Sequence, residues 1–271
     1  MFRDHLRMRP LKHVKTTVST VAKKKKRANK AVEILGMYAD GMRTNQIFWS
    51  DETWVDQDSC ARYNPQNDRM YFPKDQKKDD NLDKLIKPIR QRAPGIMVHI
   101  TVTSAGGGQV LKPFFVDPGE TMTAKYYIRM LKTDTLRQIA TIVPPGGKFY
   151  FQQDLASPHT AKITKEFLAE NDVALAPWLP SGADCSPLDI YVNPELKKRL
   201  RGQDLSTTQK LMGATARHLD AMSKDAKFLK GLKKCCKGIK KWTKWVAYNE
   251  GRPVTHTLVN AEQQENKSAQ K

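Results

Sequence analysis

The chain has 271 residues and a mass of 30.8 kDa, with 39% hydrophobic and 28% charged residues. This composition is typical of a globular protein, and the length is sufficient to bury a core. No apolar run approaches the roughly 18 residues of a membrane span, which argues against a membrane protein. The four cysteines form neither a CxxC pair nor a His/Cys metal-ligand spacing, which argues against a zinc module. The first ten residues contain no apolar segment, so we expect no secretory signal and a reducing compartment.

Positive charge is concentrated in two short regions. The sequence carries 47 Lys and Arg residues against 28 Asp and Glu residues, a formal net charge of +19. Residues 1–30 contain 11 basic residues and 1 acidic residue, and residues 221–250 contain 9 lysines and 2 acids. A polyanion fits these clusters, because each phosphate that is neutralised releases counterions. The pattern therefore favours a nucleic-acid partner over the plainer alternative of a soluble, lysine-rich surface.

Residues 1–45 are expected to form a basic N-terminal arm. Its cationic run consists of Lys23, Lys24, Lys25, Lys26 and Arg27. Such a run is typical of a phosphate-binding or nuclear-import segment, so we assign these residues to DNA binding and expect the nucleus as the location. A short helix is predicted over residues 31–42, and the body of the protein begins at Gln46.

The body is predicted to contain a sheet that begins with paired strands. The apolar run 47–49 predicts a buried strand, a weaker strand is predicted near 70–72, and the β-branched segment 96–102 predicts another. Glycines 106–108 supply a turn to a returning strand at 110–116, so these last two segments form a hairpin.

From residue 121 onward, helices alternate with strands. Predicted helices cover 121–141, 159–170 and a stretch from Leu188 to about Arg201, and predicted strands cover 149–153 and 173–178. Hairpin strands followed by strands joined through helices predict an α/β fold, a mixed five-stranded sheet flanked by helices.

The region 203–250 is predicted to be a basic, helical C-terminal extension, followed by a polar tail at 251–271. Apolar residues between Phe228 and Trp242 recur at steps of three and four, and lysines recur likewise on another face. We assign five lysines of this region and the helix before it to DNA binding, with an ordinary solvated lysine face as the alternative. These residues are Lys197, Lys198, Lys234, Lys237 and Lys241.

Three aspartates stand at positions that suit metal chemistry. Asp51 follows the apolar run 47–49, Asp154 follows the aromatic strand 149–151, and Asp189 begins a helical segment. A carboxylate at a strand end points into the crevice beside the sheet. Three carboxylates in one cleft repel each other unless cations lie between them, and oxygen-only ligands suit Mg²⁺. Spacing alone leaves the alternative open that these aspartates are turn or cap residues.

Three segments resemble, in order, the blocks that carry the three acids of the Tc/mariner transposases, members of the DDE group. They are Ile47-Phe48-Trp49-Ser50-Asp51-Glu52, Phe151-Gln152-Gln153-Asp154 with the following Ala156, Pro158 and His159, and Pro177-Trp178 with Asp184, Ser186, Pro187 and Asp189. The 34 residues between Asp154 and Asp189 match the separation typical of the superfamily. The resemblance extends from about Lys23 to Gly251.

This resemblance implies an RNase H-like catalytic domain over residues 46–202. Asp51, Asp154 and Asp189 would bind two Mg²⁺ ions, with Mn²⁺ as a substitute, and cleave phosphodiester bonds at transposon ends. The freed 3′-hydroxyl would then be joined to target DNA. Double-stranded DNA is the implied partner, with a homodimer in a complex of transposon ends. His159 is expected to position substrate or a neighbouring carboxylate, although a packing role fits equally.

Three departures from the family pattern bear on the metal site or on the domain organisation. Leu155 stands where the family usually has Asn after the second acid. Pro194 interrupts a helix that the family continues, at a cost of about 3 kcal/mol, so either Asn193 caps a new helix or Asp189 lies on an irregular turn. Asp51 comes too early for the paired helix-turn-helix modules of relatives, so residues 1–45 resemble a remnant of the second module with its linker.

Two alternative functions are left open, and the first of them follows from these departures. A truncated or domesticated copy would be a catalytically inactive DNA-binding relic. A more distant alternative is a basic RNA-binding or ribosome-associated protein, for which the order of the acids would be a coincidence.

Overall fold

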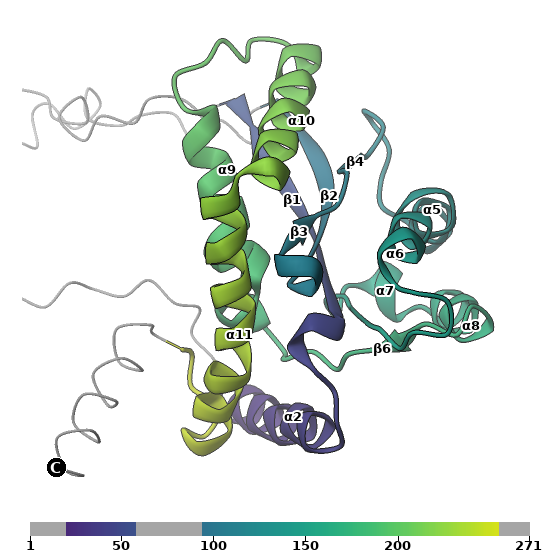
Figure 1. Cartoon of the computed structure of the whole chain (residues 1–271), viewed down its shortest axis with the longest axis vertical. Helices are drawn as coiled ribbons and strands as arrows, with labels where there is room; N and C mark the ends of the chain where they lie inside the picture. The colour runs from purple at the N-terminus through teal and green to yellow at the C-terminus, as the bar shows by residue number, and fades with distance from the viewer. Residues whose placement is uncertain (1–19, 58–93, 255–271) are drawn as a thin grey trace, which may run out of the picture.

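The computed structural model describes residues 20–57 and 94–254. The weak strand predicted near 70–72 lies outside the described residues. Within them, the predicted α/β fold class is confirmed, since a mixed sheet is flanked by helices on both faces (Figure 1).

Strand β1 (Ile47–Asp56) lies at the centre of the sheet. It pairs antiparallel with β2 (Gly95–Thr103) and parallel with β5 (Tyr150–Gln152), which pairs parallel with β6 (Ala174–Leu175). Strands β3 (Gln109–Val110) and β4 (Phe114–Phe115) both pair antiparallel with β2. The described sheet therefore has six strands, not the five predicted.

The extra strand arises because the predicted returning strand at 110–116 is interrupted. Pro113 has no N–H to donate to a ladder. The backbone of Lys112 instead exchanges two hydrogen bonds with the side chain of Gln138, at 2.7 and 3.1 Å. The hairpin is thus confirmed, but its second arm consists of two short strands.

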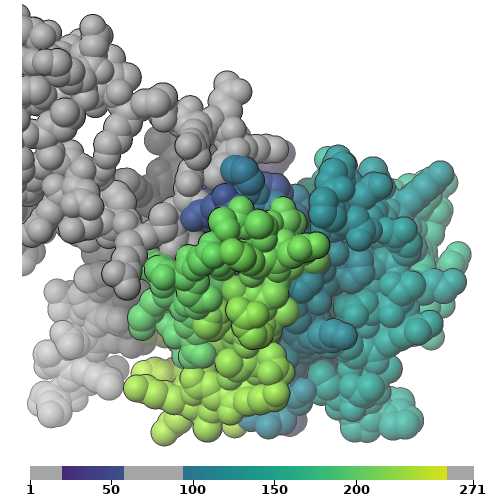
Figure 2. Space-filling model, turned by 90° about the horizontal axis from the view of Figure 1, so that it is seen from above, coloured from purple at the N-terminus to yellow at the C-terminus, as the bar shows by residue number. Residues whose placement is uncertain are grey.

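Helices form a layer on each face of the sheet. One layer contains α5 (Ala124–Met130), α6 (Leu136–Ile142), α7 (Ser157–Thr160) and α8 (Lys162–Glu170). The other contains α2 (Val21–Ala39), α9 (Asn193–Leu200), α10 (Thr208–Lys224) and α11 (Ala226–Tyr248). The space-filling view shows α10 and α11, in green to yellow, beside the teal layer (Figure 2). Among the described residues, no helix is both long and apolar enough to cross a bilayer.

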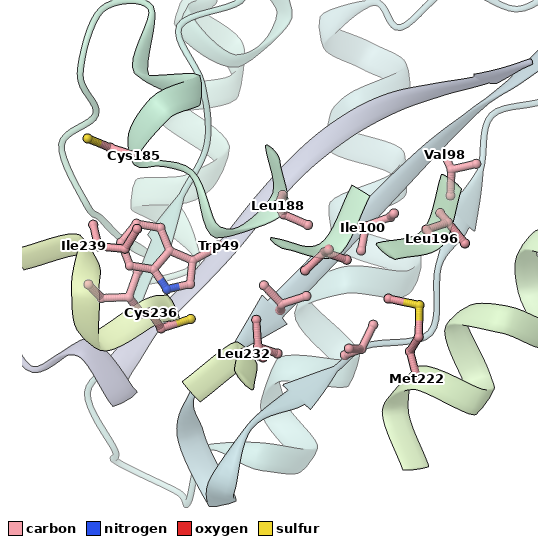
Figure 3. Close-up of a cluster of buried hydrophobic side chains, with 14 of the residues drawn as sticks. Trp49, Val98, Ile100, Cys185, Leu188, Leu196, Met222, Leu232, Cys236 and Ile239 are labelled. Carbon is pink, nitrogen blue, oxygen red and sulfur yellow. The ribbon is translucent and has the colours of Figure 1, made fainter. Parts of the chain in front are cut away.

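The two faces of the sheet carry two separate apolar cores. Ile47 and Trp49 belong to the core under α2 and α9–α11, whereas Phe48 belongs to the core under α5, α6 and α8. This is the two-residue alternation of a strand that is buried on both sides. Figure 3 shows Trp49 beside Ile239 and Cys236 of α11. The N-terminal and C-terminal helices therefore pack directly on the sheet, while the domain boundaries at 45, 202 and 250 stay predictions.

Candidate active site

The three predicted aspartates line one pocket of about 400 Å³. The rest of its wall comes from the middle of β1, from the end of β5 with the residues that follow it, and from the segment that precedes α9. Its other lining residues are Ser50, Gln152, Leu155, Ala156, Trp178, Leu179, Ser181, Gly182, Ala183 and Ser186. The structure thus brings Asp51, Asp154 and Asp189 together, and their roles as metal ligands and catalytic groups stay predictions.

Asp51 does not follow a strand, as the sequence suggested, but lies in the middle of β1, opposite Ile100 of β2. The strand continues to Asp56 because its pairing with β2 supplies backbone partners beyond the apolar run. Successive side chains of a strand point to opposite faces. Asp51 therefore shares a face with Trp49, and Glu52 shares the other face with Phe48.

The other two aspartates lie outside the strands of the sheet. Asp154 lies two residues past the end of β5, as predicted. Asp189 lies on a π-helical turn, Leu188–Val192, so the irregular-turn alternative is the one that the structure shows. Asn193 makes no side-chain cap, and Pro194 occupies the first turn of α9, where proline is tolerated.

Burial and mutual repulsion disfavour the charged forms of two of these carboxyls. Burial, followed by the charges of Asp189, Glu52 and Asp154, raises the pKa of Asp51 to about 8. Burial also raises the pKa of Asp189, against the opposing effects of the Ser186 hydroxyl and the Lys197 charge. A cation between the carboxylates would relieve this repulsion.

The chemistry of the donor set, rather than the present spacing of its side chains, fits a hard divalent cation. Three carboxylates face one space, and the buried Gln152, which also lines it, has a side-chain oxygen without a hydrogen-bond partner. Oxygen ligands of this kind suit Mg²⁺ or Mn²⁺. In the residues that the structure describes, no three acidic, histidine or cysteine side chains are close enough to enclose an ion.

Asp51→Asn should change how the stability of the metal-free protein depends on pH. Between pH 5 and 6.5 the folded protein keeps a proton on Asp51 that the unfolded chain releases, so stability falls as pH rises. The fall due to Asp51 is up to about 2 kcal/mol over this window. The asparagine variant should lose that component, as measured by urea unfolding in EDTA at both pH values. Equal slopes in the variant and the wild type would contradict the raised pKa.

Behind the pocket lies a buried network of acidic and histidine side chains that the sequence analysis did not identify. Glu52 contacts His99 Nδ1 at 2.8 Å through one oxygen and His159 Nε2 at 3.3 Å through the other. His159 Nδ1 in turn lies 2.5 Å from Asp154 Oδ1. The sequence held part of this information, because the alternation of a strand places Glu52 on the face of the sheet that Asp51 does not occupy. The pairing of Glu52 with His99, however, depends on the register of β1 and β2.

Within this buried network, each charged side chain stabilises the ionised form of its neighbour. Burial would raise the pKa of Glu52, but its contacts with His159 and His99 outweigh burial and hold that pKa well below its usual range. Burial would lower the pKa of His159, but its bonds to Asp154 and Glu52 raise it to about 9. The hydrogen bond from His159 is also the main cause of a lowered pKa for Asp154. At neutral pH an imidazolium therefore lies between two carboxylates.

The surroundings of His159 fix its orientation. The ring of Tyr127 lies 4.2 Å from the His159 ring, measured between centroids. The Tyr127 hydroxyl donates to Gln153 Oε1 at 2.8 Å, and the Gln153 amide donates to the His159 carbonyl at 2.9 Å. His159 contacts Asp154, and its predicted role of positioning that carboxylate stays a prediction.

One of the residues assigned to DNA binding is placed elsewhere. Arg27 is only 3% exposed, because it lies on the core face of α2 with Ala31 and Ile34, and it pairs with Asp184. Its assignment as a DNA contact is therefore wrong. The remaining assigned lysines reach the surface to different degrees. Lys23, Lys25, Lys26, Lys198, Lys234 and Lys237 are exposed, and Lys24, Lys197 and Lys241 are half-buried.

Comparison with known proteins gives matches among solved structures. No protein-family model and no curated protein matches the chain. The Mos1 strand transfer complex matches with a TM-score of 0.72 and 16% identity over 94% of this chain and 69% of that one. The Mos1 mariner paired-end complex with Mn matches with a TM-score of 0.72 and 16% identity over 93% and 70%.

The catalytic domain of Mos1 mariner transposase, solved by itself, also matches. Its TM-score is 0.59 at 15% identity, and the alignment covers 90% of this chain and 100% of that domain. At such identities the likeness concerns the fold, and it includes the mixed sheet with helices on both faces. The chain therefore has the RNase H-like fold of the catalytic domain of Mos1 mariner transposase.

Proposed function

We propose that this chain is a Tc/mariner-type transposase, a DNA endonuclease and strand transferase that acts at transposon ends. The observation that carries the proposal is the convergence of Asp51, Asp154 and Asp189 on one pocket, within a fold shared with a transposase. The similar Mos1 structures include paired-end complexes, which supports double-stranded DNA as the partner and a homodimer that holds two ends. With the basic run of α2, this function suggests the nucleus as the location.

Asp51, Asp154 and Asp189 would hold two divalent cations, Mg²⁺ or Mn²⁺. Mos1 structures were solved with both metals. When bound, such ions lower the pKa of water and stabilise charge on phosphate oxygens. Two donors orient the Asp154 carboxylate by contacting its Oδ1, namely His159 Nδ1 at 2.5 Å and the Ala156 N–H at 2.9 Å. Trp178 and Leu179 supply an apolar side to the pocket, which limits access of water from that direction.

Helix α11 offers a surface for the DNA backbone. Its 23 residues contain eight lysines and no acid. At 100° per residue the lysines occupy the arc opposite to the buried residues. The buried residues include Phe228, Leu232, Cys236 and Ile239. Because the apolar face is already covered by the protein core, the helix cannot insert that face into a lipid surface, and phosphate remains as the fitting partner.

Replacing Lys234, Lys237 and Lys241 with glutamine should weaken DNA binding uniformly across sequences. Each lost phosphate contact lowers the steepness of the salt dependence, so the slope of log K against log salt should fall in magnitude by about 2 to 3. Fluorescence anisotropy with a random duplex over a salt series measures this slope. Lys162→Gln with Lys165→Gln, on α8 in the opposite layer, is the matched control. A slope unchanged by the α11 replacements would remove this helix from the DNA interface.

Cleavage of DNA that carries the matching terminal repeat tests the function itself. The full chain should nick this duplex in Mg²⁺ or Mn²⁺ and not in EDTA. The competing proposal, an inactive relic, is favoured by Leu155, an exposed apolar side chain in the pocket where the family usually has Asn. Salt-sensitive DNA binding without metal-dependent nicking would support the relic and contradict the enzyme.

A further inference from the structure

A buried ion pair joins helix α2 to the segment that forms one wall of the pocket. Arg27 Nη2 donates to both carboxylate oxygens of Asp184, and the side chains are 3% and 20% exposed. The two residues are 157 positions apart in the sequence. The guanidinium is planar and its donors point in fixed directions, so contacts made by Nη1 and Nη2 together fix its orientation as well as its position.

The same guanidinium holds the backbone before Asp184. Arg27 Nη1 donates to the carbonyl oxygens of Pro180, at 3.2 Å, and Ser181. Ser181 has a φ of +52°, in the left-handed region that disfavours residues with a side chain. Contacts from Arg27 therefore stabilise a backbone conformation that the local sequence alone would not favour.

The segment held by Arg27 is part of the pocket. Ser181, Gly182 and Ala183 line the same space as Asp189, which follows a few residues later. Gly182 lies against the Trp178 ring so closely that a Cβ there would come within 2.8 Å of it. A shift of this segment would therefore move the wall of the pocket and the turn that carries Asp189.

A third part of the chain meets at the same place. The Val254 N–H donates to Asp184 Oδ2, so Asp184 binds α2 and the segment after α11 together. Gly251, with a φ of +74°, lies so close to α2 that a Cβ there would come within 2.0 Å of the Lys24 carbonyl oxygen. Figure 1 shows α2 beside the C-terminal end of α11.

We propose that Arg27 is a positioning residue, which fixes residues 181–189 and makes the pocket wall move as one body with the basic helix α2. The consequence for cleavage rests on the proposed function, whereas the fixing of the segment does not. Buried ion pairs often add little net stability, so a local effect on this segment distinguishes positioning from general support of the fold.

Hydrogen–deuterium exchange of the full chain tests the local effect. Arg27→Gln should speed exchange of the amides in 181–189 by about tenfold or more, with no comparable change in β2. Asp184→Asn should also speed exchange of these amides. Lys30→Gln is the matched control, since Lys30 lies on the same helix in an exposed pair with Glu33. Unchanged exchange of 181–189 in a folded Arg27→Gln variant would overturn the proposal.

Two further measurements connect positioning to the site. Mn²⁺ affinity without DNA, measured by calorimetry, should fall about 10- to 100-fold in Arg27→Gln, as for other changes that disturb ligand orientation. In cleavage, kcat should fall while the KM for DNA stays near the wild-type value, because the exposed lysines remain. An Arg27→Gln variant with wild-type Mn²⁺ affinity would contradict the proposal.

Arg27→Lys keeps the charge but cannot contact Asp184 and both carbonyls together, and it should give a smaller change in exchange of the same amides. If Arg27→Gln fails to fold, exchange of these amides in Arg27→Lys becomes the deciding measurement. If the wild-type chain neither binds Mn²⁺ nor cleaves DNA, the proposed function fails, yet exchange in 181–189 still decides whether Arg27 positions the segment.

Discussion

Asp154→Asn should abolish metal-dependent DNA cleavage and leave DNA binding in EDTA unchanged. The substitution keeps the size of the side chain but removes the charge that a hard cation requires. Loss of a partner outside the ligand shell already costs about 10- to 100-fold in activity, so loss of a ligand should cost more than about 100-fold. Nicking of a supercoiled or end-bearing duplex in Mg²⁺ measures the first effect, and anisotropy in EDTA measures the second.

Asp172→Asn provides the matched control for this experiment. Asp172 is exposed after α8 and has a φ of +54°, a conformation that asparagine accepts. The control should cleave at the wild-type rate. If Asp154→Asn also cleaved at that rate, Asp154 would not be a ligand, and the proposed function would lose its main support.

Glu52→Gln should destabilise the fold by up to about 3 to 5 kcal/mol at pH 7, because the buried His159 imidazolium loses one of its two carboxylate partners and keeps only Asp154. The folded-state pKa of Glu52 is depressed, so its contribution is present above the unfolded pKa of about 4.3 and is lost as pH falls below it. The difference between variant and wild type should therefore shrink as pH approaches 3. Urea unfolding at pH 3 to 8 measures it.

Removal of Glu52 also changes the histidine beside it. The pKa of His159 is about 9 in part because of Glu52, so it should fall in the variant, as followed by NMR of the imidazole. Glu166→Gln is the control, since Glu166 is an exposed member of a 3.7 Å pair with Lys162 on α8. It should change stability by less than about 1 kcal/mol. A similarly small effect of Glu52→Gln would show that His159 is neutral in the folded protein.

Local patterns predicted the central strands because these segments are apolar on both faces. The apolar run 47–49 and the β-branched run 96–102 could be recognised without any knowledge of distant residues. The end of β1 could not be predicted in this way, because its polar residues face a pocket on one side and histidines on the other. Only the pairing with β2, about fifty residues away, shows that the strand continues to Asp56.

The role of Arg27 illustrates the opposite error. Its four lysine neighbours suggested a uniformly charged surface, but helical spacing places Arg27 one turn before Ala31 and two turns before Ile34, on the buried face. The signal was present in the sequence and was masked by the charge run. Its partner Asp184 could not have been inferred, because a contact across 157 residues is set by packing.

Because the two acids of β1 are adjacent, the site depends on the register of this one strand, which decides the face of the sheet to which each acid points. Asp51 and Glu52 point to opposite sides, so one dipeptide supplies both an acid for the pocket and the anchor of the histidines. A one-residue insertion before them would exchange the two duties, giving the shorter acid to the histidines and the longer one to the pocket. Evolution along this strand is thus confined to substitution, and length variation must be absorbed in the connections outside it.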